Sequence, residues 1–286
     1  MFKRVVCVDW SGANRDDQKV DLRIVESQPQ ETPSVVKAPK GRRRWSREEC
    51  GAFLTEALRS DQPRTLIAVD FGLGLPWGTD EALFDCRGWR ALVERLSAIY
   101  SECGTARKTA KEINVLPRFD GHGPFRFNDS RTDYRFYVDH GVSYYRLVDQ
   151  CVPQAISHWY LGSGGTVGFH TISGLATVAQ LLQERDKGRV DFRVWPQEGA
   201  QVDQSRHVMA EIYPAVFRVP EDLPGDLDGH ETDAWRAAIA ISDADQANEL
   251  DKWFEIRPPK FGRVDGVPVD TQVAFEGWIL GVPHYI

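Results

Sequence analysis

The sequence predicts an α/β protein with a mixed central sheet and helices on both faces. Short apolar segments that end in turns alternate with stretches of helical periodicity. One of these segments, 66–70, is apolar on both faces, which is typical of a central strand. The chain has 286 residues, of which 42% are hydrophobic and 27% charged, so it can bury an ample core.

The first seventy residues predict three strands, a helix and a fourth strand. The helix begins at the N-cap Ser46, where SREE places Glu49 at the capping-box position, and runs to about residue 60. Pro63 separates it from the fourth strand. The strands are expected at 2–9, 20–27, 35–37 and 66–70.

The rest of the chain predicts helices interrupted by two more strands. Helices are expected from 79, over 89–103, 142–160 and 171–186, and within 226–248, with strands at 190–195 and 208–213. The last forty residues predict a loop and then a short closing helix. We expect one domain, residues 1–286, with a mostly helical insertion at 104–188, where Pro and Gly interrupt a charged stretch.

Composition and charge argue against several classes of protein. A net charge of −7 argues against a nonspecific nucleic-acid binder, although two basic segments stand out. One is 40–47, with Arg43 and Arg44, and the other is 125–137, where aromatic residues alternate with arginines. Five cysteines without a CxxC pair favour reduced thiols in a cytoplasmic protein. No apolar run approaches the roughly 18 residues of a membrane span, and the oligomeric state stays open.

Two apolar strands end in a carboxylate. VVCVD ends at Asp9 and LIAVD at Asp70. A buried, unpaired carboxylate costs several kcal/mol, so each should face a cleft or a cation. If the two strands are neighbours, their carboxylates come within roughly 5 Å, and a divalent ion relieves the repulsion.

Two further acids occupy similar settings. Glu211 lies late in the strand of MAEIYPAVF, and Asp233 lies in the first turn of the helix in HETDAWRAAIAI. His230 precedes Asp233 by three residues and so shares its helical face. Each acid alone is more typical of a structural role, and the helix dipole alone would stabilise Asp233. The four together favour a catalytic site.

Several motifs resemble a known group. They are VDWSGA (8–13), VDFGLGLPWG (69–78), SRTD (130–133), VWPQEG (194–199), EIYPAVF (211–217), HETDAWRAAIA (230–240) and EGWILG (276–281). In this order they resemble the predicted nucleases called domain of unknown function family 429, in the ribonuclease H-like superfamily. HETDAW is also similar to the histidine–x–x–aspartate helix of Holliday-junction resolvases. The resemblance implies a ribonuclease H-like sheet.

The resemblance also implies a metal-dependent nuclease that hydrolyses phosphodiester bonds of DNA or RNA. Asp9 would bridge two Mg²⁺ or Mn²⁺ ions about 4 Å apart, Asp70 would hold one of them and Asp233 the other. Glu211 would be a fourth ligand. In such a mechanism His230 would protonate the leaving group or assist product release, although a residue at a helix entry that only contacts solvent explains it equally well.

The remaining motif positions are implied to face the substrate. They are Arg131, Asp133 and Glu198, beside the basic Arg43 and Arg44. The glutamate that ribonuclease H carries on its first helix has no clear counterpart, because Glu48 and Glu49 serve equally well as capping residues.

Two other classes of function remain open. LGSGGTVG (161–168) and the glycine turns after Asp9 and Asp70 suit an actin-like ATPase or phosphotransferase, although the pattern GxxxxGK[ST] is missing. Alternatively, the basic and aromatic segments would make a noncatalytic nucleic-acid-binding or protein-binding module.

Overall fold

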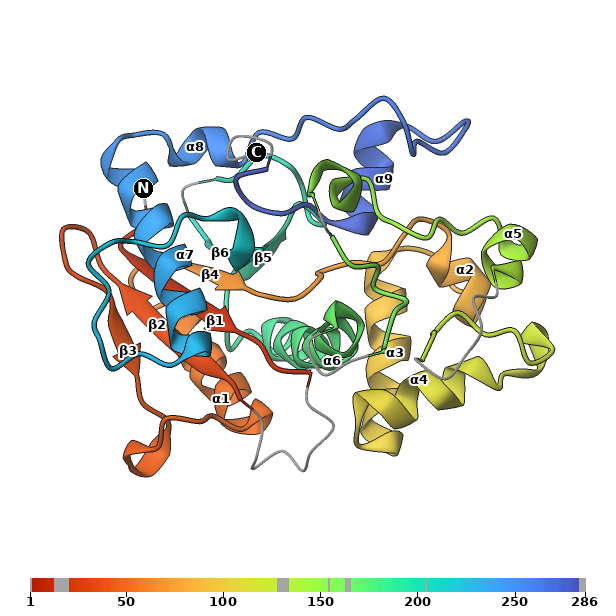
Figure 1. Ribbon diagram of the computed structural model, residues 1–286, viewed down its shortest axis with the longest axis horizontal. Coiled ribbons are helices and arrows are strands. Elements are labelled where there is room, and N and C mark those ends of the chain that lie inside the picture. The colour runs from red at the N-terminus through yellow and green to blue at the C-terminus, as the bar shows by residue number, and fades with distance from the viewer. Residues whose placement is uncertain are drawn as a thin grey trace.

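A six-stranded sheet runs through the molecule in the order β3–β2–β1–β4–β6–β5 (Figure 1). This computed structural model describes residues 2–12, 21–127, 134–153, 155–162, 166–203 and 205–282. The strands are β1 (Arg4–Asp9), β2 (Arg23–Ser27), β3 (Ser34–Val36), β4 (Thr65–Val69), β5 (Phe192–Trp195) and β6 (His207–Glu211). β2 is antiparallel to its neighbours β1 and β3, whereas β1, β4, β6 and β5 run parallel. The predicted mixed sheet is confirmed.

Helices cover both faces of the sheet. The helices are α1 (Arg47–Ala57), α2 (Thr79–Phe84), α3 (Trp89–Cys103), α4 (Ala106–Asn114), α5 (Arg135–His140), α6 (Val167–Asp186), α7 (Gly229–Gln246), α8 (Leu250–Trp253) and α9 (Val269–Glu276). Short 3-10 turns occur at Pro39–Gly41, Pro117–Phe119, Val148–Cys151 and Pro214–Val216. α6 packs against α1 and α3 on one face, and α7 lies across β1 and β2 on the other (Figure 1).

Side-chain alternation divides the core into two halves. On β1, Val6 and Val8 join the core beneath α6, whereas Val5 and Cys7 join the core beneath α7. A strand buried on both faces can therefore be apolar throughout, as the sequence indicated. Asp9 follows Cys7 by two positions, so it points to the α7 face.

Two capping boxes fix the helix starts that matter for the site. Ser46 and Glu49 exchange hydrogen bonds at the start of α1, as predicted. Asp228 and Glu231 do the same for α7, and Arg23 of β2 donates to Asp228 at 2.6 Å. The first turn of α7 is thereby held next to the end of β1.

The predicted helix over 142–160 is wrong. Within the described part of this range, the only helical turn is Val148–Cys151. The Asp149 carboxylate accepts a hydrogen bond from the backbone N–H of Arg146 at 3.0 Å, and Pro153 has no N–H to continue a helix. Buried polar contacts set this segment, which apolar spacing cannot indicate.

Two helix boundaries also differ from the predictions. α6 begins at residue 167 and not at 171, because Gly168 belongs to the helix and lets it approach residue 158: a Cβ there would lie 2.4 Å from the His158 carbonyl oxygen. The last helix, α9, ends at Glu276, the first residue of EGWILG, and Ile279 of that motif bridges to Glu211 of β6.

None of the helices in the described residues has both the length and the apolar character needed to cross a bilayer.

We predict that Gly174→Ala destabilises the protein by about 1–3 kcal/mol in urea unfolding, because the added Cβ would lie 2.4 Å from the Phe71 ring. Gly51→Ala is the matched control. Gly51 lies within α1, and its added Cβ would come no closer than 3.8 Å to any residue outside that helix. This change should therefore raise the unfolding free energy by up to about 1 kcal/mol. Similar effects of the two changes would contradict the packing of α6 on the loop after β4.

Candidate functional site

The pairing of β1 with β4 places Asp9 and Asp70 side by side. Val8 pairs with Val69, and the Asp70 backbone N–H donates to the Val8 carbonyl oxygen at 3.0 Å. The next position on each strand is therefore an aspartate, and paired residues on neighbouring strands point to the same face. The two carboxylates meet at the carboxyl edge of the sheet.

The residues that follow the two aspartates are anchored together on α6. The Trp10 indole N–H donates to Ser173 Oγ at 2.9 Å. The Trp10 and Phe71 rings pack edge to face, with centroids 4.9 Å apart. The backbone just beyond each acid is thus held by one helix, which fixes where both carboxylates point.

Asp9 is buried, with 3% of its surface exposed. Its Oδ1 lies 2.7 Å from Nδ1 of His230. Burial raises the pKa of Asp9 to about 6, although the hydrogen bond from His230 opposes this, and the Asp233 carboxylate adds to the rise. In turn, this contact with Asp9 raises the pKa of His230.

Asp70 is the second acid of the site whose pKa is raised. Burial raises its pKa well above the ordinary value, and the carboxylates of Asp9, Asp233 and Glu211 raise it further, in that order. Arg236 opposes the rise only as the last of the causes. Asp70 therefore experiences a surplus of negative charge, which is the condition that a bound cation relieves.

Asp233 and His230 come from the first turns of α7. The Asp233 carboxylate accepts from Arg236 at 2.8 Å, and it is close enough to both Asp9 and Asp70 to raise their pKa values. His230 is 48% exposed, so one side of its ring faces solvent. The predicted histidine and aspartate on one helical face both lie beside β1.

Glu211 is separated from these three acids by the sheet register. It pairs with Val69 and not with Asp70, so its side chain points to the opposite face. Both of its oxygens are bound by Arg146, at 2.6 and 2.7 Å, and one also accepts from the Leu73 N–H at 2.9 Å. Through its contact with Leu73, Glu211 holds the loop after β4 from the face opposite to Asp9 and Asp70.

Arg146 is the centre of a buried polar cluster that the sequence analysis missed. It is 1% exposed and binds Glu211, Asp149 and the carbonyl oxygen of Glu276. Burial alone would raise the pKa of Asp149, but Arg146 and His158 together outweigh burial and lower it. Arg146 was missed because it lies in a segment that we predicted to be an amphipathic helix.

Two histidines occupy the space beside the glycines that follow the aspartates. A Cβ on Gly12 would lie 2.5 Å from the His170 ring, and one on Gly72 would lie 2.3 Å from His158 Nε2. The His170 ring also bonds the backbone carbonyl of Asp70, and burial lowers the pKa of His170 to about 4, so it is neutral near pH 7. Both glycine turns are packed against protein side chains, which leaves them unlike open phosphate loops.

The basic residues predicted to face the substrate flank the start of α7. Arg43 lies 3.3 Å from Glu231, one residue after His230, and Arg44 pairs with Asp21 at 2.9 Å. Both guanidinium groups are about half exposed on this rim.

Glu198 serves a different part of the fold. It binds Arg185 near the end of α6 through both oxygens at 2.6 Å and accepts from the Val194 N–H. It therefore closes the turn after β5. The other two predicted substrate residues, Arg131 and Asp133, lie outside the described residues.

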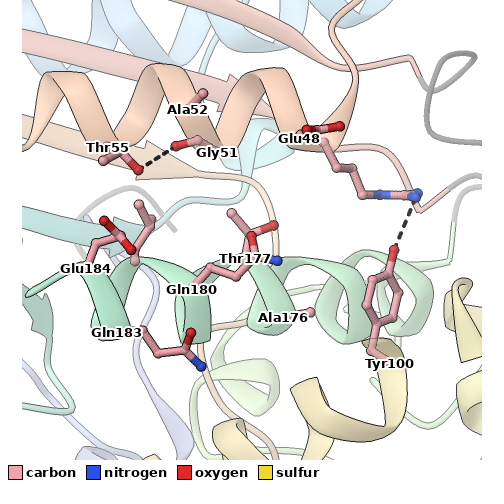
Figure 2. Close-up of a pocket in the computed structure, with 12 residues that line it drawn as sticks. Glu48, Gly51, Ala52, Thr55, Tyr100, Ala176, Thr177, Gln180, Gln183 and Glu184 are labelled. Atoms are coloured by element: carbon pink, nitrogen blue, oxygen red, sulfur yellow. Dashed lines mark hydrogen bonds between the residues drawn. The ribbon is translucent and has the colours of Figure 1, made fainter. Parts of the chain in front are cut away.

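Across the residues that the structure describes, no three His, Cys, Asp or Glu side chains are already grouped tightly enough to hold a metal ion. A polar cavity of about 370 Å³ lies between α1 and α6. Figure 2 shows the acids Glu48 and Glu184 on its wall, with Thr177 and Gln180 between them. Arg47 also lines the cavity, so its charged groups are of both signs.

The chain matched no protein-family model, no curated protein and no solved structure in the three comparisons made.

We predict that Arg146→Met costs about 3–5 kcal/mol of unfolding free energy, because it leaves Glu211 and Asp149 buried without their cation. Arg146→Lys should lose less, since it retains the charge but not the two-pronged contact. The control is Arg257→Met, which breaks an exposed ion pair with Glu255 and should cost under about 1 kcal/mol. If Arg146→Met and Arg257→Met lost equal unfolding free energy in urea, the buried cluster would contribute no more stability than an exposed ion pair.

We predict that Asp70→Asn stabilises the metal-free protein near pH 8. A carboxyl whose folded pKa lies above its unfolded value contributes stability at low pH and loses it as pH rises through the folded pKa. Asparagine removes that loss, which amounts to at least about 1 kcal/mol if the shift is one pKa unit. Urea unfolding in EDTA at pH 5 and pH 8 measures the difference.

The gain should shrink at pH 5, where the wild-type carboxyl is closer to its protonated form. Asp265→Asn, in an exposed loop, is the control and should change little at either pH. A destabilised Asp70→Asn at pH 8 would mean that the acid is satisfied without a cation.

Proposed function

We propose that this protein is a divalent-metal-dependent nuclease that hydrolyses phosphodiester bonds of nucleic acid. The observation that carries the proposal is the gathering of Asp9, Asp70 and Asp233 from segments far apart in the chain. At the carboxyl edge of the sheet, Asp9 and Asp233 both raise the pKa of Asp70, and Asp233 also raises that of Asp9. Acids whose pKa values are raised by burial and by neighbouring carboxylates are concentrated at functional sites.

The donor set suits Mg²⁺ or Mn²⁺. Mg²⁺ is usually bound by one or two carboxylates, with water and substrate phosphate completing the shell, so a closed protein cage is not required. Asp9, Asp70 and Asp233 would hold the ion. When bound, it would supply charge stabilisation at the phosphate and a more acidic water. We leave Glu211 out of the proposed ligand set, because Arg146 occupies both its oxygens.

The fold supports the proposal. Three strands, a helix, a fourth strand that ends at an acid, and a late helix bearing an acid follow one another in the order of the ribonuclease H-like fold. The motifs that resemble domain of unknown function family 429 include those that carry Asp9, Asp70 and Asp233. We therefore propose a ribonuclease H-like domain.

His230 is placed to move a proton. Its Nδ1 is held by Asp9, which raises its pKa and orients the ring, while much of the side chain faces solvent. A histidine held in this way donates a proton to a leaving oxygen near neutral pH. Arg43, beside the next residue of α7, would offset charge on the incoming phosphates.

We predict that Asp70→Asn abolishes Mn²⁺-dependent cleavage of labelled single-stranded and duplex DNA and RNA, with a loss of roughly a hundredfold or more. Asp9→Asn should do the same, and His230→Gln should lose less and flatten the pH profile. Gel analysis of the products over a time course measures each rate. Mn²⁺ should also raise the melting temperature of wild type and not that of Asp70→Asn.

Asp265→Asn is again the control and should cleave like wild type. Equal cleavage by wild type and Asp70→Asn would defeat the site assignment. Hydrolysis of ATP without strand scission would favour the phosphotransferase class, although the packed glycine turns disfavour it. Strand binding without either activity would favour a binding module.

A further inference from the structure

Aromatic and basic side chains gather on the segments between α3 and α6. Their shared feature is that each cationic group lies over an aromatic ring. The set, called here the aromatic-basic platform, comprises Arg107, Lys111, Arg126, Phe127, Tyr134 and Tyr144. The proposed nuclease site uses none of these residues.

Arg126 lies between two tyrosines. Its guanidinium carbon is 4.9 Å from the centre of the Tyr134 ring and 5.6 Å from that of Tyr144, and it donates to the Tyr144 hydroxyl at 3.3 Å. Tyr134 is 49% exposed although it belongs to this packed group. A large ring held in place and half exposed offers a stacking surface at little entropic cost.

A second cationic pair lies over the neighbouring ring. Arg107 and Lys111, one turn apart on α4, lie 5.1 and 5.9 Å from the centre of Phe127. Residues 105–127 contain five basic and two acidic side chains, a local charge of +3 in a chain of −7. The positive charge is thus concentrated where the rings are.

The platform is linked to the acid site through the segment around Trp159. The Arg126 N–H donates to the Trp159 carbonyl oxygen at 2.8 Å, and the Leu161 N–H donates to the Arg126 carbonyl oxygen at 2.7 Å. The preceding residue, His158, lies against Gly72, two positions after Asp70. A chain bound on the platform would therefore lie close to the proposed site of cleavage.

We propose that the aromatic-basic platform binds single-stranded nucleic acid and delivers it to the acid site. This inference rests on the proposed function for its choice of ligand. The cations pair with phosphates, and the Tyr134 ring stacks on a base. A base inside a duplex is stacked on its neighbours and cannot reach such a ring, so single strands are the matching substrate class.

The test is fluorescence anisotropy of labelled single strands of about 20 nucleotides, and of the matched duplex, with the full chain in EDTA. Tyr134→Leu should weaken single-strand binding roughly five- to a hundredfold, the effect of one lost stack. Lys111→Glu should weaken binding and lower the slope of log affinity against log salt by roughly 0.7 or more.

Each variant has a matched control elsewhere. Phe261→Leu removes another exposed ring, and Lys252→Glu reverses an exposed charge on α8, at the opposite end of the molecule from α4 (Figure 1). Both should bind like wild type. Circular dichroism and melting temperature confirm that every variant is folded.

The outcomes separate this inference from the proposed function. Unchanged binding by Tyr134→Leu and Lys111→Glu, tighter binding of the duplex, or no binding at all would overturn the platform. Cleavage in Mn²⁺ with any of those results would leave the nuclease standing. Binding that depends on the platform, without cleavage, would support the platform and remove the nuclease.

Discussion

The candidate site depends on the parallel pairing of β1 with β4. One backbone register, in which Val8 meets Val69, puts Asp9 and Asp70 at adjacent strand ends and on one face. The same geometry excludes Glu211, which is one position out of step with Asp70 and points to the other face. Because side chains alternate along a strand, a shift of one residue would exchange these roles. The fold therefore gathers Asp9 and Asp70 on one face of the sheet and turns the Glu211 side chain to the other.

Two clusters of acids lie close together, and they differ in how their negative charge is compensated. Glu211 and Asp149 are buried against Arg146, which binds both and lowers the pKa of Asp149. Asp9 and Asp70 have weaker compensation, and their pKa values are raised. The proposed metal site would need open positions for water and substrate, whereas Arg146 is satisfied by protein groups alone. The Arg146 cluster holds the loop after β4, and this fixes the position of the Asp70 carboxylate next to Asp9.

Much of this arrangement follows from local sequence, and the rest does not. Asp9 and Asp70 were predicted because an acid at the end of an apolar run is costly wherever it is placed, and the predicted capping box at Ser46 exists. The register between β4 and β6 could not be predicted, because nothing within MAEIYPAVF indicates which residue of β4 pairs with Glu211. Arg146 and His158 were missed for a related reason. Arg146 also binds Glu211 and Glu276, which are distant in the sequence, and isolated polar residues in a mixed segment give no periodic signal.

A net charge of −7 is unfavourable for the proposed binding of nucleic acid, but residues 105–127 carry a local charge of +3. Coulomb attraction at physiological salt is screened beyond about 8 Å, so a phosphate responds to the side chains nearest to it and not to the total. A strand held by cations over aromatic rings would be attracted along one surface and repelled from the acidic remainder. At the acid site, the proposed divalent ion would offset the repulsion between a phosphate and the carboxylates. Binding of strand and ion at that site should then be mutually reinforcing, as reciprocal linkage requires.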